Sequence, residues 1–549
     1  MKKTAFLKRC CFFCAFVFFS SSLAGSLLAC KAKSPVIKAI DPKIGEMGDI
    51  ISIMGEHFGK EQDASYITIA GQEPTSSSYL EWTDTLIRVR LPEFGRTGLI
   101  SVYKGDQKSN AVLFSNRSKI PEQAQYALAS VGPRIDMIKP NSASIGGLIS
   151  IQGGGFGAMR EDRSVRFSWI AENSLLNTEN RGETVIEPFD MGLGYELWTS
   201  DEIRVRVPDG TVSGAVEIHT AQGNSAPVFF TVEDKPGTKA FRDKRSWIVA
   251  YSANILVHDS STPNTLYLWL PQPAYSSSQP NIELLSRDKE PFVENYRGTT
   301  LFQIKDVAAQ SNISINVSYV VDVYAVETVV APQSIRTQNV SLPASYTQSD
   351  SLIPSHDPAI TARVAEIAGR ERNPYIKAQR IYEWIIANIA IQNDPLNNGA
   401  LDVLEQKQAD SYSASLLFCA LSRSAGVPAI PVAGVLIDRN RVAHVHYWAE
   451  FWIDGFGWVP LDLALGARTA PEFFSLQDDA ETWYFGNLDN QRISFSRGQN
   501  RLSQMDPRGR LAAHKPDYAL QDFWEEAVGG ITSYSSLWSD IAIMGMYTQ

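Results

Sequence analysis

Three stretches near the C-terminal end decide the fold of this chain: Q-A-D-S-Y-S-A-S-L-L-F-C-A-L-S-R-S-A-G-V-P-A at 408–429, H-V-H-Y-W-A-E at 444–450 and G-W-V-P-L-D at 457–462. The first predicts a helix that begins at Ser411, after Asp410 as N-cap, and stops at Gly426. The others predict strands, after an earlier one at 429–437. A helix start, a histidine and a carboxylate thus follow one another, as in sites of nucleophilic catalysis.

The three motifs resemble the core of the transglutaminase-like (papain-type) family. Its pattern is C-x-D-[YF]-A-x-L-[LF]-x-A-L-x-R-x-x-G-[IV]-P-A, followed by H-x-W-x-E and G-W-x-x-x-D. The resemblance implies an α+β papain-like domain with a Cys, His and Asp triad. Counting back from Arg423 and Gly426 puts Ser411 in the position of the cysteine, while His446 and Asp462 match the other two. The nucleophile is therefore exchanged on a scaffold that is expected to be intact.

Whether this domain catalyses a reaction or only binds a ligand depends on the exchange at residue 411. A thiol at a helix N-terminus beside an imidazolium ionises readily. A serine hydroxyl is far less acidic, and a helix dipole offers only about 1–2 kcal/mol. Ser411 would need His446 as a general base, with Asp462 to orient the imidazole. Cys419 lies about 12 Å further along the same helix among apolar residues, so we expect a buried core thiol there.

Other residues of the motifs are candidates for the walls of a cleft. His444 and His446 point to the same side of a strand, and the H-x-W-x-E phasing favours His446 as the base. We expect Trp448 and Trp458 to belong to the core or to the cleft wall, and His444 to face the solvent or the cleft. Glu450 is expected to form a structural salt bridge. Cys/His clusters with zinc spacing are absent from the sequence, so neither a metal nor a cofactor is expected.

The first 29 residues predict a signal peptide. A positive start precedes an apolar run at 10–24, which is too short to span a bilayer. The sequence Leu27-Leu28-Ala29-Cys30 resembles a bacterial lipobox. That resemblance implies cleavage before Cys30 and its acylation, with 30–34 as anchor and linker. Because only Cys419 would then remain as a free thiol, the mature chain would form no internal disulfide.

An internal repeat covers the N-terminal half at 35–117 and 133–233, joined by a linker at 118–132. G-D-I-I-S-I-M-G-E-H-F-G at 48–59 matches G-G-L-I-S-I-Q-G-G-G-F-G at 146–157. Short apolar runs between glycine-rich turns predict β-sandwiches, and the glycines are expected to supply positive φ. The pattern resembles IPT/TIG domains, which implies tandem all-β immunoglobulin-like sandwiches that act as spacers or contact proteins or glycans.

The remaining chain divides into three parts by pattern. Alternating strands at 234–345 resemble the β-sandwich that often precedes bacterial transglutaminase-like cores. Helical spacing from about 358 onward assigns 346–475 to the transglutaminase-like domain, and 476–549 is a C-terminal extension. We therefore predict a multidomain protein. Its net charge of −10 argues against a nucleic-acid partner.

Three functions remain open at this point. The first is a lipid-anchored envelope protein, on the periplasmic or surface face of a bacterial membrane, whose inactive transglutaminase-like domain binds a peptide, a protein or peptidoglycan. The second is an active peptidase, amidase or acyl transferase that uses Ser411, His446 and Asp462. The third is an adhesion or scaffold protein that acts through its IPT/TIG domains.

Overall fold

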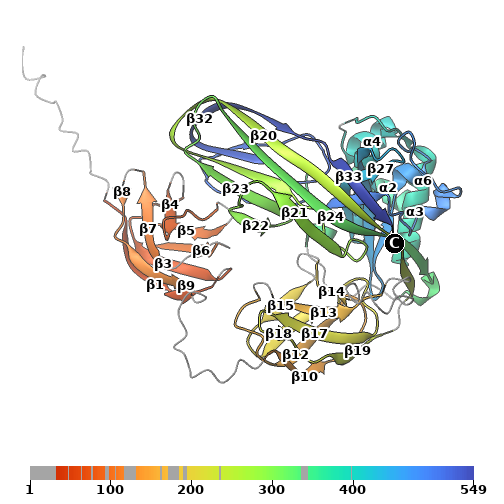
Figure 1. The fold of residues 1–549 in the computed structure, drawn as a ribbon, viewed down its shortest axis with the longest axis horizontal. Coiled ribbons are helices and arrows are strands. Elements are labelled where there is room, and N and C mark those ends of the chain that lie inside the picture. Colours follow the sequence, from red (N-terminus) through yellow and green to blue (C-terminus); the bar gives the residue numbers. More distant parts are fainter. Residues whose placement is uncertain are drawn as a thin grey trace, which may run out of the picture.

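The computed structural model describes residues 33–548 except 47, 63–64, 76–77, 93–97, 106, 117–131, 161–162, 171–184, 190–193, 234–235, 336–343 and 397. The predicted signal peptide, Cys30 and nearly all of the linker lie outside the described residues. Two β-sandwiches, one large curved sheet and a mixed domain with helices make up the described chain (Figure 1). The multidomain fold class predicted above is therefore confirmed.

Each of the first two domains is a pair of sheets. In the first sandwich the sheets are β1 (Val36–Asp41), β3 (Ile50–Glu56), β6 (Leu86–Arg90), β5 (Tyr79–Trp82), and β2 (Ile44–Gly45), β9 (Val112–Asn116), β7 (Gly98–Lys104), β4 (Tyr66–Ile69), with β8 (Gln107–Lys108) beside β7. In the second sandwich they are β10 (Arg134–Lys139), β12 (Leu148–Gly154), β16 (Glu202–Arg206), β15 (Tyr195–Trp198), and β11 (Ser142–Ala143), β19 (Val228–Val232), β17 (Gly214–Thr220), β13 (Ser164–Ser168), β14 (Val185–Ile186), with β18 (Gly223–Asn224) beside β17.

The two sandwiches repeat each other down to single hydrogen bonds. The indole of Trp82 donates to the Phe58 carbonyl at 3.3 Å, and Trp198 donates to Phe156 at the same distance. Both phenylalanines are fully buried, because each closes one end of its core. The internal repeat inferred from sequence is thus a structural repeat as well.

The matched glycines serve two purposes rather than one. Gly59 and Gly157 have φ of 104° and 83°, as expected. Gly55 and Gly153 have no positive φ. A Cβ on Gly55 would lie 2.0 Å from a backbone oxygen of Val36, and the second copy shows the same approach, so these glycines permit strands to come close together.

The third unit is one eight-stranded sheet built around an exceptionally long strand. Its members are β20 (Gly237–Pro271), β21 (Asn281–Arg287), β22 (Val293–Tyr296), β23 (Thr299–Lys305), β24 (Ser311–Val330), β31 (Arg510–Ala512), β32 (Glu525–Trp538) and β33 (Ala542–Thr548). On one edge of β20 its two halves pair with β24 and β23, and on the other edge they pair with β33 and β32. Both edges of the long strand are thereby paired over most of its length, from Arg245 to Leu268.

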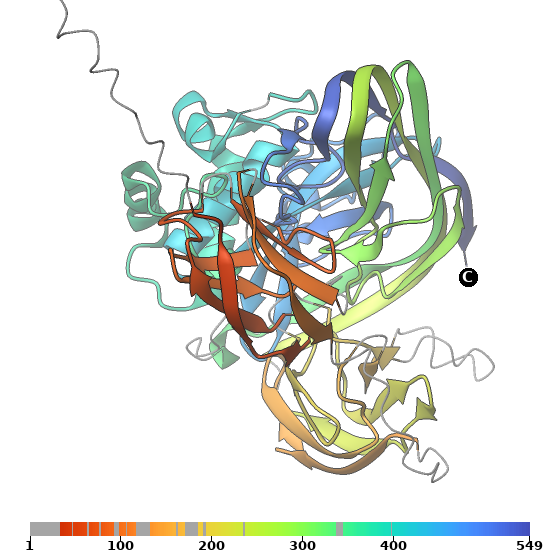
Figure 2. The same cartoon turned by 90° about the vertical axis from the view of Figure 1, so that its left-hand side faces the viewer.

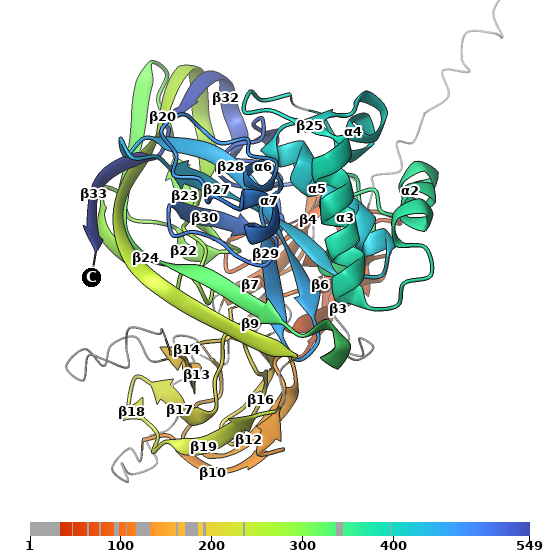
Figure 3. The same ribbon diagram turned by 90° about the vertical axis from the view of Figure 1, so that its right-hand side faces the viewer.

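The mixed domain carries the predicted helix and strands. Its helices are α1 (Ala344–Thr347), α2 (Pro358–Ala368), α3 (Pro374–Asn388), α4 (Ala400–Gln406), α5 (Ser411–Ser424), α6 (Leu463–Gly466) and α7 (Ala480–Trp483). Its strands are β25 (Ala390–Ile391), β26 (Gln408–Ala409), β27 (Ala429–Ile437), β28 (Ala443–Ile453), β29 (Gly457–Leu461) and β30 (Arg492–Arg497). Helices α2 to α6 gather on one side and the long strands β20 and β24 on the other (Figure 3).

The C-terminal extension is not a separate unit. Strand β30 pairs with β27 and completes the sheet of the mixed domain in the order β29-β28-β27-β30, so that domain continues past the expected boundary at 475. Strands β31 to β33 then return to the large sheet. The mixed domain is thus inserted between strands of one sheet, a connection that pattern alone did not indicate.

A buried junction fixes the second sandwich to the rest. Lys239 on β20 pairs with Asp209 at 2.6 Å, with side chains only 8% and 3% exposed, and its ammonium also donates to the Trp458 carbonyl. The apolar core around this pair is shared by all three units, with Trp169 from the second sandwich and Tyr324 from β24 among its members. Such a junction favours one rigid arrangement.

The first sandwich, in front in Figure 2, contacts the body through a more exposed patch. Arg508 pairs with Glu73 at 3.0 Å and lies over the ring of Tyr66. Burial and the charge of Asp506 raise the pKa of Glu73 to about 7, although Arg508 opposes them. A small patch of this kind fixes a domain less firmly than the buried core of the second sandwich.

Deleting residues 525–548 is expected to leave one edge of β20 without its partners. An exposed edge of that length pairs with other chains, so the shortened protein should elute as aggregates in size-exclusion chromatography. Deleting residues 1–131 serves as the control, because the first sandwich has a core of its own; the remainder should stay monomeric. A monomeric 525–548 deletion with an unchanged melting temperature would contradict the argument.

Candidate active site

The N-terminus of α5 is built by its capping residue. Asp410 is extended, and its carboxylate accepts hydrogen bonds from the Ser413 amide at 2.8 Å and the Ser413 hydroxyl at 2.7 Å. Its other oxygen accepts from the Leu396 amide. Ser411 is therefore the first residue of the helix, where free amides give a positive potential. This agrees with the expected helix start, and Gly426 with φ of 79° ends the helix region as predicted.

Strand pairing brings His446 and Asp462 together. The last residue of β29, Leu461, pairs with Ala449 of β28. Asp462 comes directly after Leu461 and therefore lies close to His446 on β28. The Nε2 of His446 lies 2.9 Å from Oδ2 of Asp462. The other carboxylate oxygen accepts from the Leu465 amide and caps α6. Asp462 thus orients the histidine and begins a helix at the same time.

The Asp462 carboxyl is ionised at any physiological pH. Burial works to raise its pKa, but the charge and hydrogen bond of His446, together with the charge of Arg492, hold its pKa at about 2. Because an ionised carboxylate only accepts, Nε2 of His446 must carry the proton. The remaining ring nitrogen, Nδ1, is then the one available to act as a base.

Arg492 on β30 is a member of the site that the sequence analysis missed. Its guanidinium reaches Asp462 at 3.0 Å and Asp489 at 2.6 Å, and it lies 5.0 Å from the ring centre of Trp448. The side chain is 4% exposed. The alternation R-I-S-F-S-R could have revealed a strand at 492–497, but nothing in the sequence marked its arginine as the partner of a carboxylate 30 residues earlier.

The Ser411 hydroxyl is held by the backbone and not by the histidine. Its Oγ accepts a hydrogen bond from the Tyr447 amide at 3.3 Å. Within the described part of the chain, no hydrogen bond joins Ser411 to His446. Tyr447 in turn packs its ring against Tyr412 and donates from its hydroxyl to the Asp517 carbonyl. The C-terminal segment therefore lies against the residue that fixes the serine.

Of the other candidate residues, Trp448 lies beside His446, whereas His444 and Trp458 lie elsewhere. His444 is half-exposed and pairs with Asp438 at 3.1 Å, near the turn between β27 and β28. Trp448 is buried and stacks near His446 at 6.5 Å. Trp458 lies elsewhere: it is 2% exposed and packs against Trp452 in the junction with the second sandwich. It cannot form a wall beside the serine.

Cys419 and Glu450 lie where the sequence analysis placed them. Burial raises the pKa of the Cys419 thiol to about 12, and the residue is fully enclosed in α5. Glu450 accepts a hydrogen bond from Arg497 at 2.6 Å as a structural ion pair. Among the described residues, His, Cys, Asp and Glu side chains form no group of three that could hold a metal ion. In the same part of the chain, no helix is both long and apolar enough to cross a bilayer.

Comparison with known proteins agrees with this geometry. Residues 361–463 match the family model described as the transglutaminase-like superfamily. The chain contains a transglutaminase-like domain. Residues 35–115 match the model of the IPT/TIG domain, which confirms the first repeat as a member of that class. Both resemblances stated from sequence are thereby confirmed for these ranges.

Individual relatives are distant. A curated protein of Haemophilus influenzae, named only as uncharacterized, is 29% identical over 169 residues, which is 25% of this chain and 45% of the relative. This chain thus spans less than half of that relative. A structure from Cytophaga hutchinsonii, provisionally described as a cysteine protease, aligns at 13% identity with TM-score 0.36 over 57% of this chain and 93% of its own.

A second structure, the periplasmic domain of TgpA from Pseudomonas aeruginosa, aligns at 14% identity with TM-score 0.24, over 44% of this chain and 92% of its own. Neither structural alignment carries an argument about function. The function of the site has to be argued from its own residues.

Replacing Asp462 with Asn is expected to lower the free energy of unfolding by about 3 kcal/mol at pH 7, because Arg492 and His446 lose a buried charge. Urea denaturation measures the loss. Since the pKa of Asp462 is about 2 when folded and 3.8 otherwise, its contribution is complete above pH 4 and disappears as the pH falls toward 2. The difference between wild type and variant should shrink over that interval.

Asp136→Asn is the control, since Asp136 forms an ion pair with Arg134 in which the two side chains are 50% and 64% exposed. Little or no loss is expected there, because solvent screens such a pair. Equal losses in the two variants would contradict the role given to the buried carboxylate.

Proposed function

We propose that this chain is a lipid-anchored protein of the bacterial cell envelope whose transglutaminase-like domain binds an extended peptide, from a protein or from peptidoglycan, without cleaving it. The observation that carries the proposal is the hydrogen bond that the Ser411 hydroxyl accepts from the Tyr447 amide, in a described structure where no hydrogen bond joins it to His446. A serine attacks only when a base removes its proton. Here the base is oriented, but no hydrogen bond connects it to the serine.

What remains at the site favours binding. The start of α5 presents amides to carbonyl or carboxylate oxygens. Ser411 and Tyr412 are partly exposed, and the charged groups behind them, Asp462 and Arg492, are buried and paired with each other. A rigid, preorganised surface of this kind binds a ligand at low entropic cost.

A Ser-dependent peptidase, amidase or acyl transferase is the second candidate. The hydrogen bond between Asp462 and His446 favours it, because this contact fixes the tautomer that a triad uses. Adhesion through the IPT/TIG domains is the third candidate. The Lys239–Asp209 junction supports it less, since it makes the second sandwich part of the body rather than a free module.

Ser411→Cys is expected to gain reactivity toward a thiol probe such as iodoacetamide near neutral pH. The new thiol would occupy a helix N-terminus beside an oriented imidazole, and both features stabilise a thiolate. Labelling is followed by mass spectrometry. The unaltered chain is the control, because its buried Cys419 should stay unlabelled, and Ser411→Cys with His446→Ala should react at least tenfold more slowly.

Two results would overturn the non-cleaving assignment. One is labelling of the native protein at Ser411 by a fluorophosphonate probe. The other is hydrolysis of any amide or ester that disappears in Ser411→Ala. An inert Ser411→Cys variant would show instead that the electrostatic features of the site are lost.

Cys30→Ser is expected to release the protein from the membrane fraction when it is expressed with its own N-terminus in a bacterial host. Several acyl chains on one residue give stable anchoring, at about 0.8 kcal/mol per buried methylene. Fractionation with immunoblotting measures the shift, and Cys419→Ser is the control. Membrane association that persists in Cys30→Ser would contradict the lipid anchor.

A further inference from the structure

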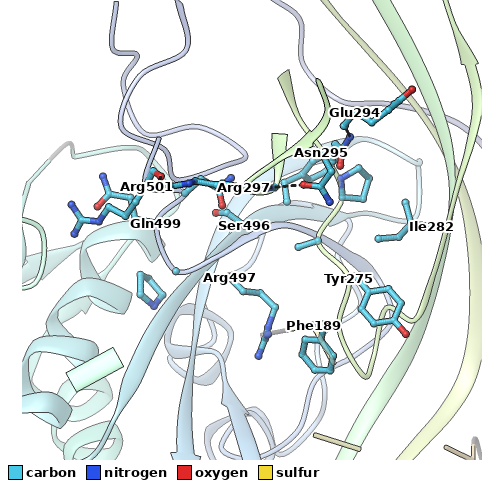
Figure 4. Close-up of a pocket in the computed structure, with 18 of the residues that line it drawn as sticks. Phe189, Tyr275, Ile282, Glu294, Asn295, Arg297, Ser496, Arg497, Gln499 and Arg501 are labelled. Carbon is cyan, nitrogen blue, oxygen red and sulfur yellow. Dashed lines mark hydrogen bonds between the residues drawn. The ribbon is translucent and has the colours of Figure 1, made fainter. Parts of the chain in front are cut away.

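A cavity lies apart from the Ser411 site. Its volume is about 1100 Å³, and it is enclosed by residues of the large sheet, the end of β30 and the second sandwich (Figure 4). Ser411, His446, Asp462 and Arg492 are not among the residues that line it. This volume is at the upper end of that for small-molecule sites, so it has room for several residues of a peptide.

One wall of the cavity is formed where the two end strands of the large sheet, β21 and β22, do not pair with each other. The strand order β21-β24-β20-β23-β22 leaves β21 and β22 as its two ends, and residues of both line the cavity. A bidentate ion pair from Arg287 to Glu294 connects the two strands across the gap, at 2.7 and 2.9 Å. All residues from 236 to 335 are described, and within them β21 pairs with β24 alone.

The free edge of β21 is suited to a further strand. The strand is seven residues long, and most of its residues are exposed. Leu284 and Leu285 are 39% and 48% exposed, so apolar surface of this strand is open to solvent. A row of backbone amides and carbonyls without strand partners is a template for an extended peptide.

The cavity is strongly basic although the protein as a whole is acidic. Two carboxylates, Glu294 and Asp350, face six arginines in the lining, namely Arg160, Arg287, Arg297, Arg423, Arg497 and Arg501. Most of these arginines are occupied by the protein itself. Arg297 is different: in the described chain it pairs with no carboxylate, and its guanidinium donates to the Arg501 carbonyl at 2.6 Å. Arg501 pairs with Asp350 at 2.7 Å and more loosely with Asp522 at 3.9 Å, and its side chain is 48% exposed.

Two amide side chains beside these arginines have unsatisfied atoms. Asn500 is 5% exposed, and its buried Nδ2 has no hydrogen-bond partner among the described residues. The same holds for Oε1 of Gln499. Both residues line the cavity, and Figure 4 shows Gln499 beside Arg501. Both atoms are shielded from solvent, so a ligand would reach them only after a change of side-chain conformation.

We propose that this cavity binds a short extended peptide that carries carboxylates. The peptide backbone adds to the edge of β21, and its carboxylates lie on Arg297 and Arg501, whose planar guanidinium groups suit bidentate contact. This site is independent of what Ser411 does, so it stands or falls separately from the function proposed above.

The test uses fluorescein-labelled (Glu-Ala)4 and fluorescence anisotropy with the whole protein. In an extended chain the glutamates share one face at a spacing of about 7 Å. The control peptide is (Gln-Ala)4, which is expected to bind at least tenfold more weakly. Binding of the acidic peptide should weaken at least threefold when NaCl rises from about 50 to about 300 mM, because exposed charges are screened.

Variants then locate the site. The double variant Arg297→Gln with Arg501→Gln should weaken binding at least tenfold, whereas Arg88→Gln on the first sandwich should leave it unchanged. Two further peptides carry N-methyl groups on alternate residues in the two possible registers. Since only one edge of a peptide can pair with β21, one register should abolish binding and the other should retain it.

Several outcomes overturn the proposal. These are equal binding of the acidic and neutral peptides, no binding of either, and binding that the double variant leaves unchanged while its melting temperature matches wild type. Equal binding of both N-methylated registers removes the role of β21. If the double variant does not fold, a lack of salt dependence in the native protein overturns the ionic contact. If a labelled trigalacturonate binds to the cavity and the acidic peptide does not, the cavity belongs to an acidic oligosaccharide instead.

Discussion

The arrangement at the centre of the molecule depends on one buried cation and its partners. Arg492 is buried between Asp462 and Asp489 and under the face of Trp448. A charge at such depth is tolerated only with its partners in place, so β30, the end of β29 and the loop before β30 must all meet at one point. The orientation of His446 follows from that meeting, because Asp462 holds the imidazole with the same oxygen that faces the arginine.

The architecture around this point separates two kinds of site. The oriented histidine and the serine at the start of α5 belong to the transglutaminase-like domain, where catalysis in the wider family would occur. The basic cavity belongs to the seam between that domain and the large sheet, and exists because β21 and β22 do not close on each other. A domain inserted into another sheet thus creates a cavity that neither part has alone.

Features that depend on neighbouring residues could be predicted from the sequence, whereas features that depend on pairing between distant segments could not. Asp410 and Gly426 delimit α5 because capping depends on a few neighbouring residues, and the repeat could be aligned because both copies keep the same offset. Arg492, the burial of Trp458 in the junction, and the return of the C-terminal strands all depend on residues far apart in sequence. No local periodicity encodes which strand a segment pairs with, so these features required the three-dimensional structure.

The pairing of β20 with β32 and β33 has a consequence for the order of events during synthesis. Ala253 pairs with Trp538, and Arg245 with Thr548, so the partners of an early strand are the last part of the chain to be made. The inserted domain can condense first, since all of its helices and strands end by Arg497, before β32 begins at Glu525. Until then, one edge of β20 has no strand partner, and an unpaired edge of this length promotes aggregation. A chaperone that shields nascent sheet edges would therefore act on this protein chiefly before translation ends.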